Sequence, residues 1–426
     1  MKRSLMSTTA LATAGAMVSG PAMAEGGIKL GLGGYMNNFF GVGDVSDDGN
    51  DFAETGMFSD GEVWFTGETT LDNGLMFGAN IQLESFSAGD QIDENFGYME
   101  GGFGRINFGS ENTAAYLMQF AAPDVGVLLN TGWITSFVPA PTGFTDAFRT
   151  PALSTYIDTG NDENTLTYFT PRLFGFQLGL SYQGALAFSG EGKNSPVQAD
   201  EDTEYRHGIS VGLNFVESFG GVNVAVAGGY RRAEAPDDDI VILDPSLGAS
   251  TNGAAIKTRR VSIPDMQQVS GGINVGYAGF TIGGSVAAEI DGRVTATTSS
   301  FTRTDFGGAT LGAARTPAGV FSTRLTTLAA ATYTSGANST EGWSWDAGIQ
   351  YDIGPWSFNG VWFHGEVEGD VLNGDEDVLD SGALAVEYEI GPGVRTSLSG
   401  IYANWDGENG ADNQGFAGVV GVTFKF

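Results

Sequence analysis

Apolar and polar residues alternate with a two-residue period along most of the chain. In the last segment, Gln414 to Phe426, one face carries Phe416, Val420, Val422, Phe424 and Phe426, and the other carries Ala417, Gly421, Thr423 and Lys425. Successive side chains of a β-strand point to opposite faces, so this period is typical of strands. Beyond the N-terminal 24 residues, no stretch approaches the roughly 18 to 20 consecutive apolar residues that a membrane-spanning helix needs.

Sixteen segments carry the strand pattern. They are Ile28 to Val42, Phe58 to Leu71, Leu75 to Phe86, Glu94 to Phe103, Arg105 to Gly109, Asn164 to Pro171, Phe174 to Gly184, Tyr205 to Glu217, Val222 to Arg231, Gln268 to Tyr277, Phe280 to Asp291, Gly342 to Ile353, Trp356 to Val367, Val378 to Ile390, Val394 to Trp405 and Gln414 to Phe426.

The connections between these segments alternate in length. Tight turns such as Asp72-Asn73-Gly74 and Gly354-Pro355 alternate with longer, acidic connections such as Asp44 to Asp51 and Glu191 to Glu204. Outer-membrane barrels have this arrangement, with short periplasmic turns and long extracellular loops, whereas a soluble sandwich need not sort its loops. We therefore expect an all-β chain that forms a transmembrane antiparallel up-and-down β-barrel of sixteen strands. An eighteen-stranded barrel is the alternative if Thr310 to Thr323 and Leu325 to Ser335 form another hairpin.

Aromatic residues gather near both ends of the predicted strands, where membrane interfaces favour them. Those near the long loops are Tyr182, Tyr205, Tyr230, Trp343 and Tyr402, and those near the short turns are Tyr277, Phe280, Tyr351, Trp356, Tyr388 and Phe426. The closing segment is expected to pair with Ile28 to Val42, which removes the open edges of the sheet.

The N-terminus has the features of a secretory signal peptide. Lys2 and Arg3 precede an apolar run, and Ala22-Met23-Ala24 precedes Glu25. This order predicts cleavage after residue 24, so residues 1–24 form the signal peptide and residues 25–426 the barrel. An uncleaved membrane anchor is the less favoured interpretation, because the run is short and contains Ser, Thr and Gly.

The charge balance excludes one class of partner. The chain has 51 acidic and 19 basic residues, and without Lys2 and Arg3 the balance becomes 17 minus 51, or −34. Nucleic acid is not expected as a partner, since phosphate binding needs a basic surface. The chain has no cysteine, so it has neither disulfides nor thiolate sites.

Motifs for catalysis or tight metal binding are weak. Asp44-x-Ser46-x-Asp48-Gly49 resembles the start of a calcium loop, but the third position is Ser and the twelfth is Thr55. His207 and His364 are the only histidines, and no nucleophile elbow, Walker loop or His-Glu-x-x-His motif occurs. We expect no enzyme activity, no cofactor and no dedicated metal site. The acidic loops remain candidates for loosely bound Ca²⁺ or Mg²⁺ that bridges lipopolysaccharide.

Three segments carry a family resemblance. They are Phe103-Gly104-Arg105-Ile106-Asn107-Phe108-Gly109, then Asn164-x-x-x-Tyr168-x-x-Pro171-x-x-x-Gly175-Phe176-x-x-x-x-x-Tyr182, and the terminal Gly421-x-x-Phe424-x-Phe426. In this order, behind a signal peptide, they resemble Gram-negative general porins of the alphaproteobacterial type. The terminal Gly421, Phe424 and Phe426 resemble the signal that the barrel assembly machinery recognises.

The resemblance implies a homotrimer in the outer membrane and a connection, Ser110 to Glu163, that folds into the lumen and narrows it. Acidic residues of this connection would face basic residues of the wall. The acidic candidates are Glu111, Asp124, Asp146, Asp158 and Asp162, beside Glu163 and a single Arg149. The family commonly has Arg where this chain has Ser110, and the basic residues that could replace it by strand parity are Lys29, Arg105, Arg206, Arg231 and Arg395. For any single one of these residues, the favoured interpretation is that it belongs to the hydrated lumen wall.

These features together predict a water-filled channel for passive diffusion of small hydrophilic solutes, with a preference for cations because the lumen is acidic. Two alternatives stay open: a substrate-specific sugar porin with eighteen strands, and a structural barrel without conductance. The expected surroundings are outer-membrane lipid and lipopolysaccharide. The trimer contacts are expected on the first five strands, where Gly31, Gly33, Gly34, Gly97, Gly101 and Gly102 allow close approach.

Overall fold

The structure is a computed structural model of the chain. It describes residues 22–23, 27–47, 54–85, 92–141, 144, 152–157, 163–186, 199, 201–202, 204–243, 258–302, 314–316, 319–321, 330–371, 376–410 and 412–426.

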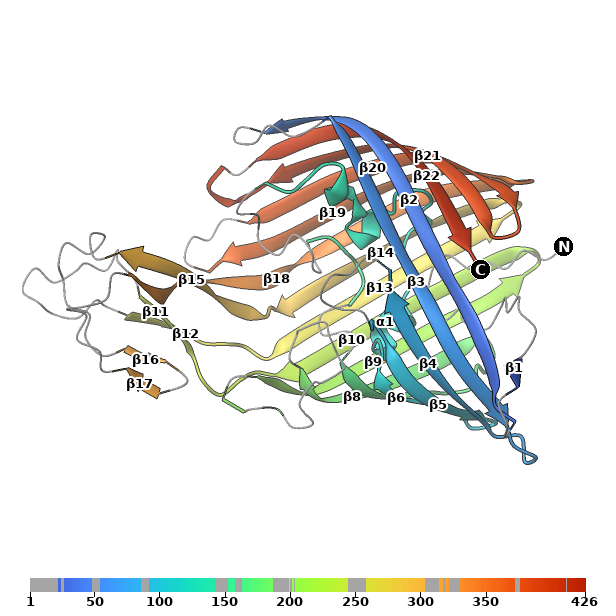
Figure 1. Cartoon of the computed structure of the whole chain (residues 1–426), viewed down its shortest axis with the longest axis horizontal. Coiled ribbons are helices and arrows are strands. Elements are labelled where there is room, and N and C mark those ends of the chain that lie inside the picture. The colour runs from blue at the N-terminus through green and yellow to red at the C-terminus, as the bar shows by residue number, and fades with distance from the viewer. Residues whose placement is uncertain are drawn as a thin grey trace, which may run out of the picture.

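Sixteen antiparallel strands form a closed barrel (Figure 1). They are β2 (Lys29–Asp47), β3 (Thr55–Thr70), β4 (Met76–Glu84), β5 (Asn95–Gly101), β6 (Gly104–Ser110), β7 (Asn164–Phe169), β8 (Phe176–Leu186), β9 (Tyr205–Phe219), β10 (Val222–Glu234), β13 (Met266–Tyr277), β14 (Phe280–Asp291), β18 (Ala330–Ile353), β19 (Trp356–Asp370), β20 (Asp377–Gly391), β21 (Val394–Asp406) and β22 (Asn413–Lys425). Each pairs with the next in this order, and β22 pairs with β2 from Tyr35 opposite Lys425 to Asp47 opposite Asn413. The predicted sixteen-stranded barrel and its closing pair are confirmed.

The eighteen-stranded alternative is wrong, because β14 pairs directly with β18 from Phe280 opposite Tyr351 to Glu289 opposite Gly342. No room is left between them for another hairpin. Instead, β18 begins at Ala330, twelve residues before the predicted start at Gly342, and its first part pairs with β15 (Val294–Thr302). This hairpin continues beyond the barrel wall, next to the small sheet of β11 (Ile240–Leu243) and β12 (Thr258–Val261) (Figure 1). A second small sheet pairs β16 (Ala314–Thr316) with β17 (Gly319–Phe321).

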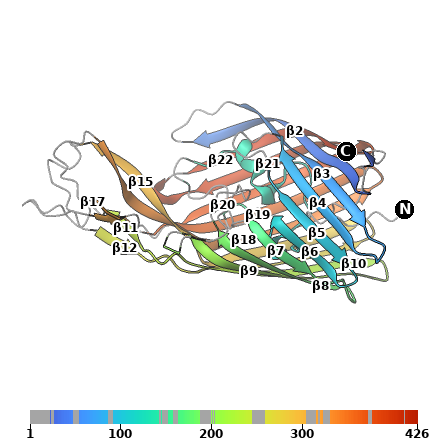
Figure 2. The same ribbon diagram turned by 60° about the horizontal axis from the view of Figure 1, so that its bottom comes forward.

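The short turns and the long connections lie at opposite rims. The short-turn rim holds the connections from β3 to β4, β5 to β6, β7 to β8, β9 to β10, β13 to β14, β18 to β19 and β20 to β21. The long-loop rim holds the others, among them the 53 residues between Ser110 of β6 and Asn164 of β7. Figure 2 brings β3 to β10 to the front of the same barrel. One further strand, β1 (Ala22–Met23), pairs with β2 and lies within the predicted signal peptide.

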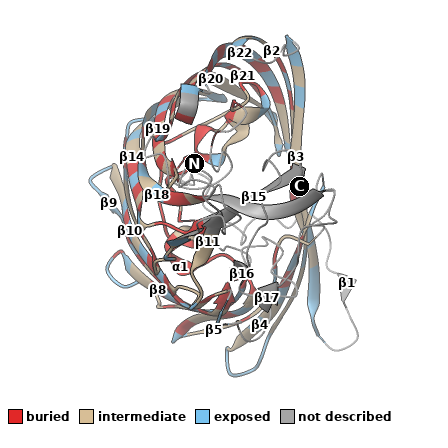
Figure 3. Cartoon of the chain, turned by 90° about the vertical axis from the view of Figure 1, so that its left-hand side faces the viewer, coloured by how far each residue is buried: buried red, intermediate tan, exposed pale blue. Residues whose placement is uncertain are grey.

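Side chains alternate between the lumen and the outer surface as predicted. On β22, Phe416, Val420 and Phe424 are exposed on the outside, while Ala417 and Val419 are buried on the inside. Figure 3 shows this alternation as bands of pale blue and red along the strands. The outer faces of all barrel strands except β5 carry exposed large apolar residues, which matches a wall that faces lipid.

The predicted aromatic girdles are present, with one exception. At the short-turn rim, Phe280 stacks on Tyr351 with ring centroids 4.3 Å apart, and Trp356 contacts Tyr388 at 4.5 Å. Tyr205 was expected in the girdle near the long loops, but it is buried at 4% exposure in a cluster with Leu186, Ala233 and Met266. Its hydroxyl donates a hydrogen bond to the carbonyl oxygen of Pro264.

Helices are short and few among the described residues. One α-helix, α1 (Ala114–Leu117), and the 3-10 turns η1 (Leu129–Thr131) and η2 (Trp133–Ser136) belong to the connection between β6 and β7, and η5 (Glu408–Gly410) precedes β22. None of the helices in the described part of the chain is long and apolar enough to cross a membrane.

Candidate functional site: the lumen and its constriction loop

The connection from Ser110 to Glu163, here called the constriction loop, folds into the barrel. Its first turn, α1, lies against the inner faces of β8 and β9. The backbone N–H of Ala114 donates to Ser181 Oγ on β8 at 2.8 Å, and that of Ala115 donates to Ser210 Oγ on β9 at 3.0 Å. The inward Gly179 and Gly212 let the loop approach closely, since a Cβ at Gly212 would lie 2.4 Å from the Ala114 carbonyl oxygen.

The next part of the loop crosses β13, β18 and β19. Asn274 on β13 donates to the carbonyl oxygen of Ala121 at 2.9 Å, and Asn359 on β19 donates to that of Pro123 at 2.7 Å. Between them, Asp346 on β18 accepts from the backbone N–H of Ala122 at 3.1 Å. Inward polar side chains of the wall therefore satisfy backbone groups that the loop could not satisfy alone.

Asp346 is the most connected of these anchors. It is 4% exposed, and besides Ala122 it accepts from the backbone N–H of Ser285 at 2.6 Å, from Ser285 Oγ at 2.8 Å and from Asn130 Nδ2 at 2.7 Å. Asn130 also binds Thr155, from the returning part of the loop. One carboxylate thus joins both parts of the loop to the wall.

The far part of the loop reaches β21, β22, β2 and β3. Trp405 donates from Nε1 to the Val138 carbonyl oxygen at 3.1 Å, and Asn413 donates to that of Pro139 at 2.6 Å. Trp133 lies against Phe39 of β2 and Phe58 of β3, with ring centroids 5.6 Å and 5.5 Å away. The largest buried apolar cluster of the described chain forms here, between the loop and the inner faces of β19 to β22.

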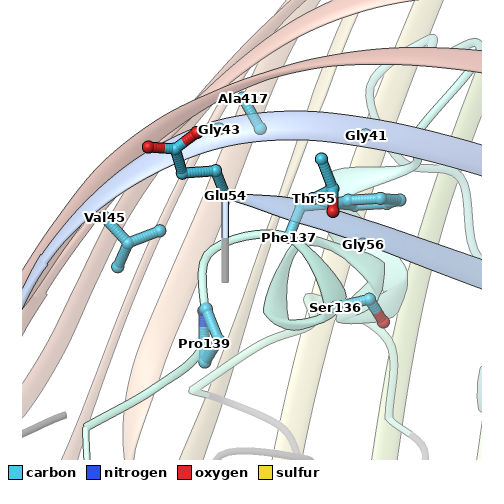
Figure 4. Close-up of a pocket in the computed structure, with 10 residues that line it drawn as sticks. All are labelled: Gly41, Gly43, Val45, Glu54, Thr55, Gly56, Ser136, Phe137, Pro139 and Ala417. Atoms are coloured by element: carbon cyan, nitrogen blue, oxygen red, sulfur yellow. The ribbon is translucent and has the colours of Figure 1, made fainter. Parts of the chain in front are cut away.

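A small pocket of about 180 Å³ remains where the loop meets β2 and β3 (Figure 4). Its wall is formed by Gly41, Gly43 and Gly56, and the ring of Phe137 lies between the strands and the loop. A Cβ at Gly41 would lie 2.4 Å from the Phe137 ring. The pocket is therefore a gap in the packing of the loop against the wall, near the long-loop rim.

The wall formed by β2 to β6 differs from the rest of the lumen. Most inward residues of β3 are half-buried, whereas those of β19 to β22 are mostly buried, and Figure 3 shows β3 mainly as intermediate and exposed. The described part of the constriction loop packs on the parts of β2 and β3 that are nearer the long-loop rim, at Phe39, Gly41 and Phe58. Closer to the short-turn rim, the inner face of β3 carries Asp60, Glu62, Trp64, Thr66 and Glu68. We call this surface, with Tyr35, Tyr98 and Glu100 beside it, the acidic wall.

A second group of carboxylates lies at the long-loop end of the acidic wall. Glu94 is 5% exposed and accepts hydrogen bonds from Gln82 and Asn112. Burial raises the pKa of Glu94 well above its ordinary value, and the nearby charge of Asp93 raises it further. Burial likewise raises the pKa of Asp93, with the charge of Glu62 as the second cause. Both carboxyl groups therefore ionise at a higher pH than free carboxylates do.

Two of the acidic candidates of the constriction loop lie in the described chain, and both are engaged within the structure. Glu111 is 5% exposed and accepts from Asn107 Nδ2 at 3.2 Å, and burial raises its pKa. Asp124 accepts from the backbone N–H of Leu129 at 2.7 Å, and desolvation raises its pKa to about 7. The other three candidates, Asp146, Asp158 and Asp162, lie outside the described residues, as does Arg149.

The five basic candidates do not form one cluster. Lys29 lies opposite Glu68, and Arg105 pairs with Glu100 at 3.6 Å, both near the short-turn rim. Arg395 pairs with Glu387 at 3.2 Å on the other side of that rim. Two lie toward the long loops. They are Arg206, which pairs with Asp237 at 2.7 Å, and Arg231, which is fully buried and donates to Gln183 Oε1 at 2.5 Å.

The acidic residues of β3 were not among the predicted site residues. The alternation of Phe58 to Leu71 already assigns Asp60, Glu62 and Glu68 to one face, so the signal was available. The sequence does not show which part of the wall the constriction loop covers.

The terminal residues close the barrel. Phe426 exchanges two backbone hydrogen bonds with Gly34 of β2, at 2.9 Å and 3.1 Å, and its ring lies over Gly34. Phe424 is exposed on the outer face, and Gly421 faces inward under the ring of Phe39. The described residues contain no group of three or more His, Cys, Asp or Glu arranged to hold a metal ion. The calcium-like loop extends from Asp44 into residues 48–53, which lie outside the described residues.

Comparison with known families decides the identity of the barrel. The model of the Gram-negative porin family matches residues 7–410. The chain belongs to the Gram-negative porin family. It is therefore an outer-membrane β-barrel protein, with the long-loop rim extracellular and the short-turn rim periplasmic.

Solved structures agree with this porin fold. The anion-selective porin from Comamonas acidovorans superposes with a TM-score of 0.52 at 11% identity, over 94% of this chain and 100% of that one. The trimer form of OmpT, an outer-membrane protein of Vibrio cholerae, gives 0.51 at 12% identity over 94% and 100%. Salmonella typhi OmpF in complex with daunomycin gives 0.51 at 14% over 94% and 98%. A search of curated protein sequences gives no match.

Proposed function

We propose that this porin conducts small hydrophilic solutes by passive diffusion and prefers cations. The observation that carries the preference is the acidic wall, where Asp60, Glu62 and Glu68 occupy the half-buried inner face of β3. A conduit lined by carboxylates with low-dielectric walls concentrates cations near it. The solute size limit is set by the constriction loop, which takes up the opposite side of the lumen.

The fold alone does not predict the sign of the selectivity. The Comamonas acidovorans protein has the same fold and is described as anion-selective. The preference of this chain must therefore come from its own lumen residues. Arg105 and Lys29 lie next to the acidic wall, and each is placed beside a carboxylate, Glu100 and Glu68 respectively. Their positive charges are thus offset locally.

The assembly and surroundings are part of the same proposal. A homotrimer is supported by the trimer form of Vibrio cholerae OmpT, and outer-membrane lipid, lipopolysaccharide and the barrel assembly machinery are the expected partners. Gly421, Phe424 and Phe426 form the assembly signal in this proposal. Ca²⁺ or Mg²⁺ would bind loosely at the acidic loops and bridge lipopolysaccharide. The protein would have no enzyme activity.

Planar-bilayer recording of the purified protein tests the function. We expect stepwise conductance and, under a KCl gradient, a zero-current potential of the sign that cation preference requires. The absence of conductance would favour the structural-barrel alternative. Saturable block by a neutral sugar would favour a sugar-specific porin with sixteen strands. A zero-current potential of the opposite sign would show that the arginines of the wall dominate.

A further inference from the structure

The acidic wall carries aromatic rings as well as carboxylates. Trp64 and Tyr35 lie with ring centroids 6.0 Å apart on the inner faces of β3 and β2, and Tyr98 lies on the inner face of β5. A wall that only had to be hydrated and acidic would have no need of these rings.

Two of the rings lie across inward glycines. A Cβ at Gly78 of β4 would lie 2.2 Å from Tyr98 Cζ, so the Tyr98 ring crosses β4 at a position where only glycine leaves room. A Cβ at Gly33 of β2 would lie 3.2 Å from the Trp64 ring. Because they lie along the wall at glycine positions, these rings can turn a face toward the lumen instead of an edge.

Each of the two rings is paired with a carboxylate. Tyr98 donates from its hydroxyl to Glu68 Oε2 at 2.8 Å, and Trp64 donates from Nε1 to Glu62 Oε2 at 2.5 Å. Alternate residues of a strand are about 6 to 7 Å apart. Glu62, Trp64, Thr66 and Glu68 therefore form a row along the inner face of β3, in which Trp64 lies between two carboxylates and Tyr98 lies beside Glu68.

The chain already places one organic cation on this surface. The guanidinium carbon of Arg105 lies 3.9 Å from the centroid of the Tyr98 ring, and the guanidinium pairs with Glu100 at 3.6 Å. A cation above an aromatic face and beside a carboxylate is the arrangement that recognises alkylammonium and guanidinium groups. Trp64 and Glu62, which lie closer to the long-loop rim, also combine an aromatic ring with a carboxylate.

We propose that the acidic wall binds and guides organic cations, meaning amines or guanidines attached to an apolar or planar body, with Trp64 and Glu62 as the binding pair. The inference rests on the proposed channel function and names the class of solute for it. The carboxylate attracts the charge and the ring contacts both the charge and the apolar body. Small inorganic cations keep their hydration shell, so only the carboxylates attract them to the acidic wall.

The test uses the full-length trimer in a planar bilayer with KCl and adds 2-phenylethylammonium as the probe. We expect brief, saturable reductions of the K⁺ current by this probe, and no such reduction by the neutral 2-phenylethanol. Trp64→Leu removes the ring without changing charge, and we expect it to weaken the block about three- to tenfold, as the loss of one cation–π contact implies.

Trp362→Leu is the matched control, because Trp362 is a strand tryptophan that faces outward at 39% exposure. It should leave the block unchanged. A cation-selective channel without block by the amine, or with equal block in Trp64→Leu and wild type, would overturn the organic-cation site alone. Equal block by 2-phenylethanol would overturn it too, in favour of an apolar site. The absence of cation-selective current in the wild type would instead overturn the proposed function.

Discussion

The carboxylate of Asp346 on β18 accepts a hydrogen bond from the backbone N–H of Ala122 in the constriction loop at 3.1 Å. The bond connects the middle of the loop to the wall opposite the acidic wall. Since Asp346 also holds Asn130, this side chain anchors two parts of the loop and helps to set the width of the open lumen. The loop is thus held against one side of the barrel by the wall itself.

Replacement of Asp346 by alanine should therefore widen the channel. The change leaves the N–H groups of Ala122 and Ser285 without their acceptor, at a cost of about 1 to 3 kcal/mol for each buried donor. We expect Asp346→Ala to admit larger neutral polyethylene glycols than the wild type in a liposome-swelling assay. Its single-channel conductance should also rise.

Asp352→Ala is the matched control for this prediction. Asp352 has the same charge and lies on the inner face of the same strand, but it accepts hydrogen bonds from Gln350 and Ser357. The control should keep the wild-type size limit. An identical size limit in both variants would contradict the role of Asp346 as the loop anchor.

The selectivity should depend on pH in a defined direction. Burial raises the pKa of Glu94 to about 8, so its carboxyl group is neutral below that value and gains a negative charge as the pH rises through it. Cation preference should therefore increase between about pH 6 and about pH 9, a range that brackets the raised pKa. Zero-current potentials in a fixed KCl gradient measure this change.

Glu94→Gln should reduce the slope of that pH profile, because glutamine keeps a hydrogen-bonding amide but cannot ionise, whereas Asp93, whose pKa is also raised, still titrates. Glu217→Gln provides the control, since Glu217 is exposed near the short turn after β9. A wild-type potential that does not change across this pH range would refute the assignment of a titrating group to Glu94.

Barrel closure should be sensitive to a side chain at Gly34. A Cβ there would lie 2.3 Å from the Glu62 carbonyl oxygen and 3.0 Å from the Phe426 ring. We expect Gly34→Ala to cost about 1 to 3 kcal/mol, the usual range for overpacking, and to lower the yield of folded barrel. Heat-modifiable mobility on gels measures that yield.

Gly400→Ala tests whether any outward glycine would behave the same way. Gly400 lies on β21, and a Cβ there would meet no atom within 4 Å. Its yield should match the wild type, and equal losses in the two variants would argue against a specific closing contact at Gly34.

The sequence predicted the barrel because its signals are local. Alternation along segments such as Gln414 to Phe426 sets the face of each residue, and loop length sets the rim. The start of β18 was placed at Gly342 rather than Ala330 because the residues before Gly342 lack alternation. Pairing with β15, beyond the barrel, extends the strand there.

The arrangement of the lumen was harder to predict. Ser181, Ser210 and Asn274 have the inward parity of a hydrated wall, yet each is buried and bonded to the loop backbone. These contacts join residues that are distant in sequence, so no local pattern reveals them. The family resemblance placed acids on the loop and bases on the wall, whereas Asp60 and Glu62 put carboxylates on the wall.

Neutralisation of the acidic wall tests the central claim most directly. The measurement is the zero-current potential in a KCl gradient for the double variant Glu62→Gln/Glu68→Gln, beside Glu366→Gln, whose side chain lies on β19 and bonds the outward Trp343. We predict that the wild type and Glu366→Gln show the same cation preference and that the double variant loses most of it. An unchanged potential in the double variant would contradict the claim that the acidic wall sets the selectivity.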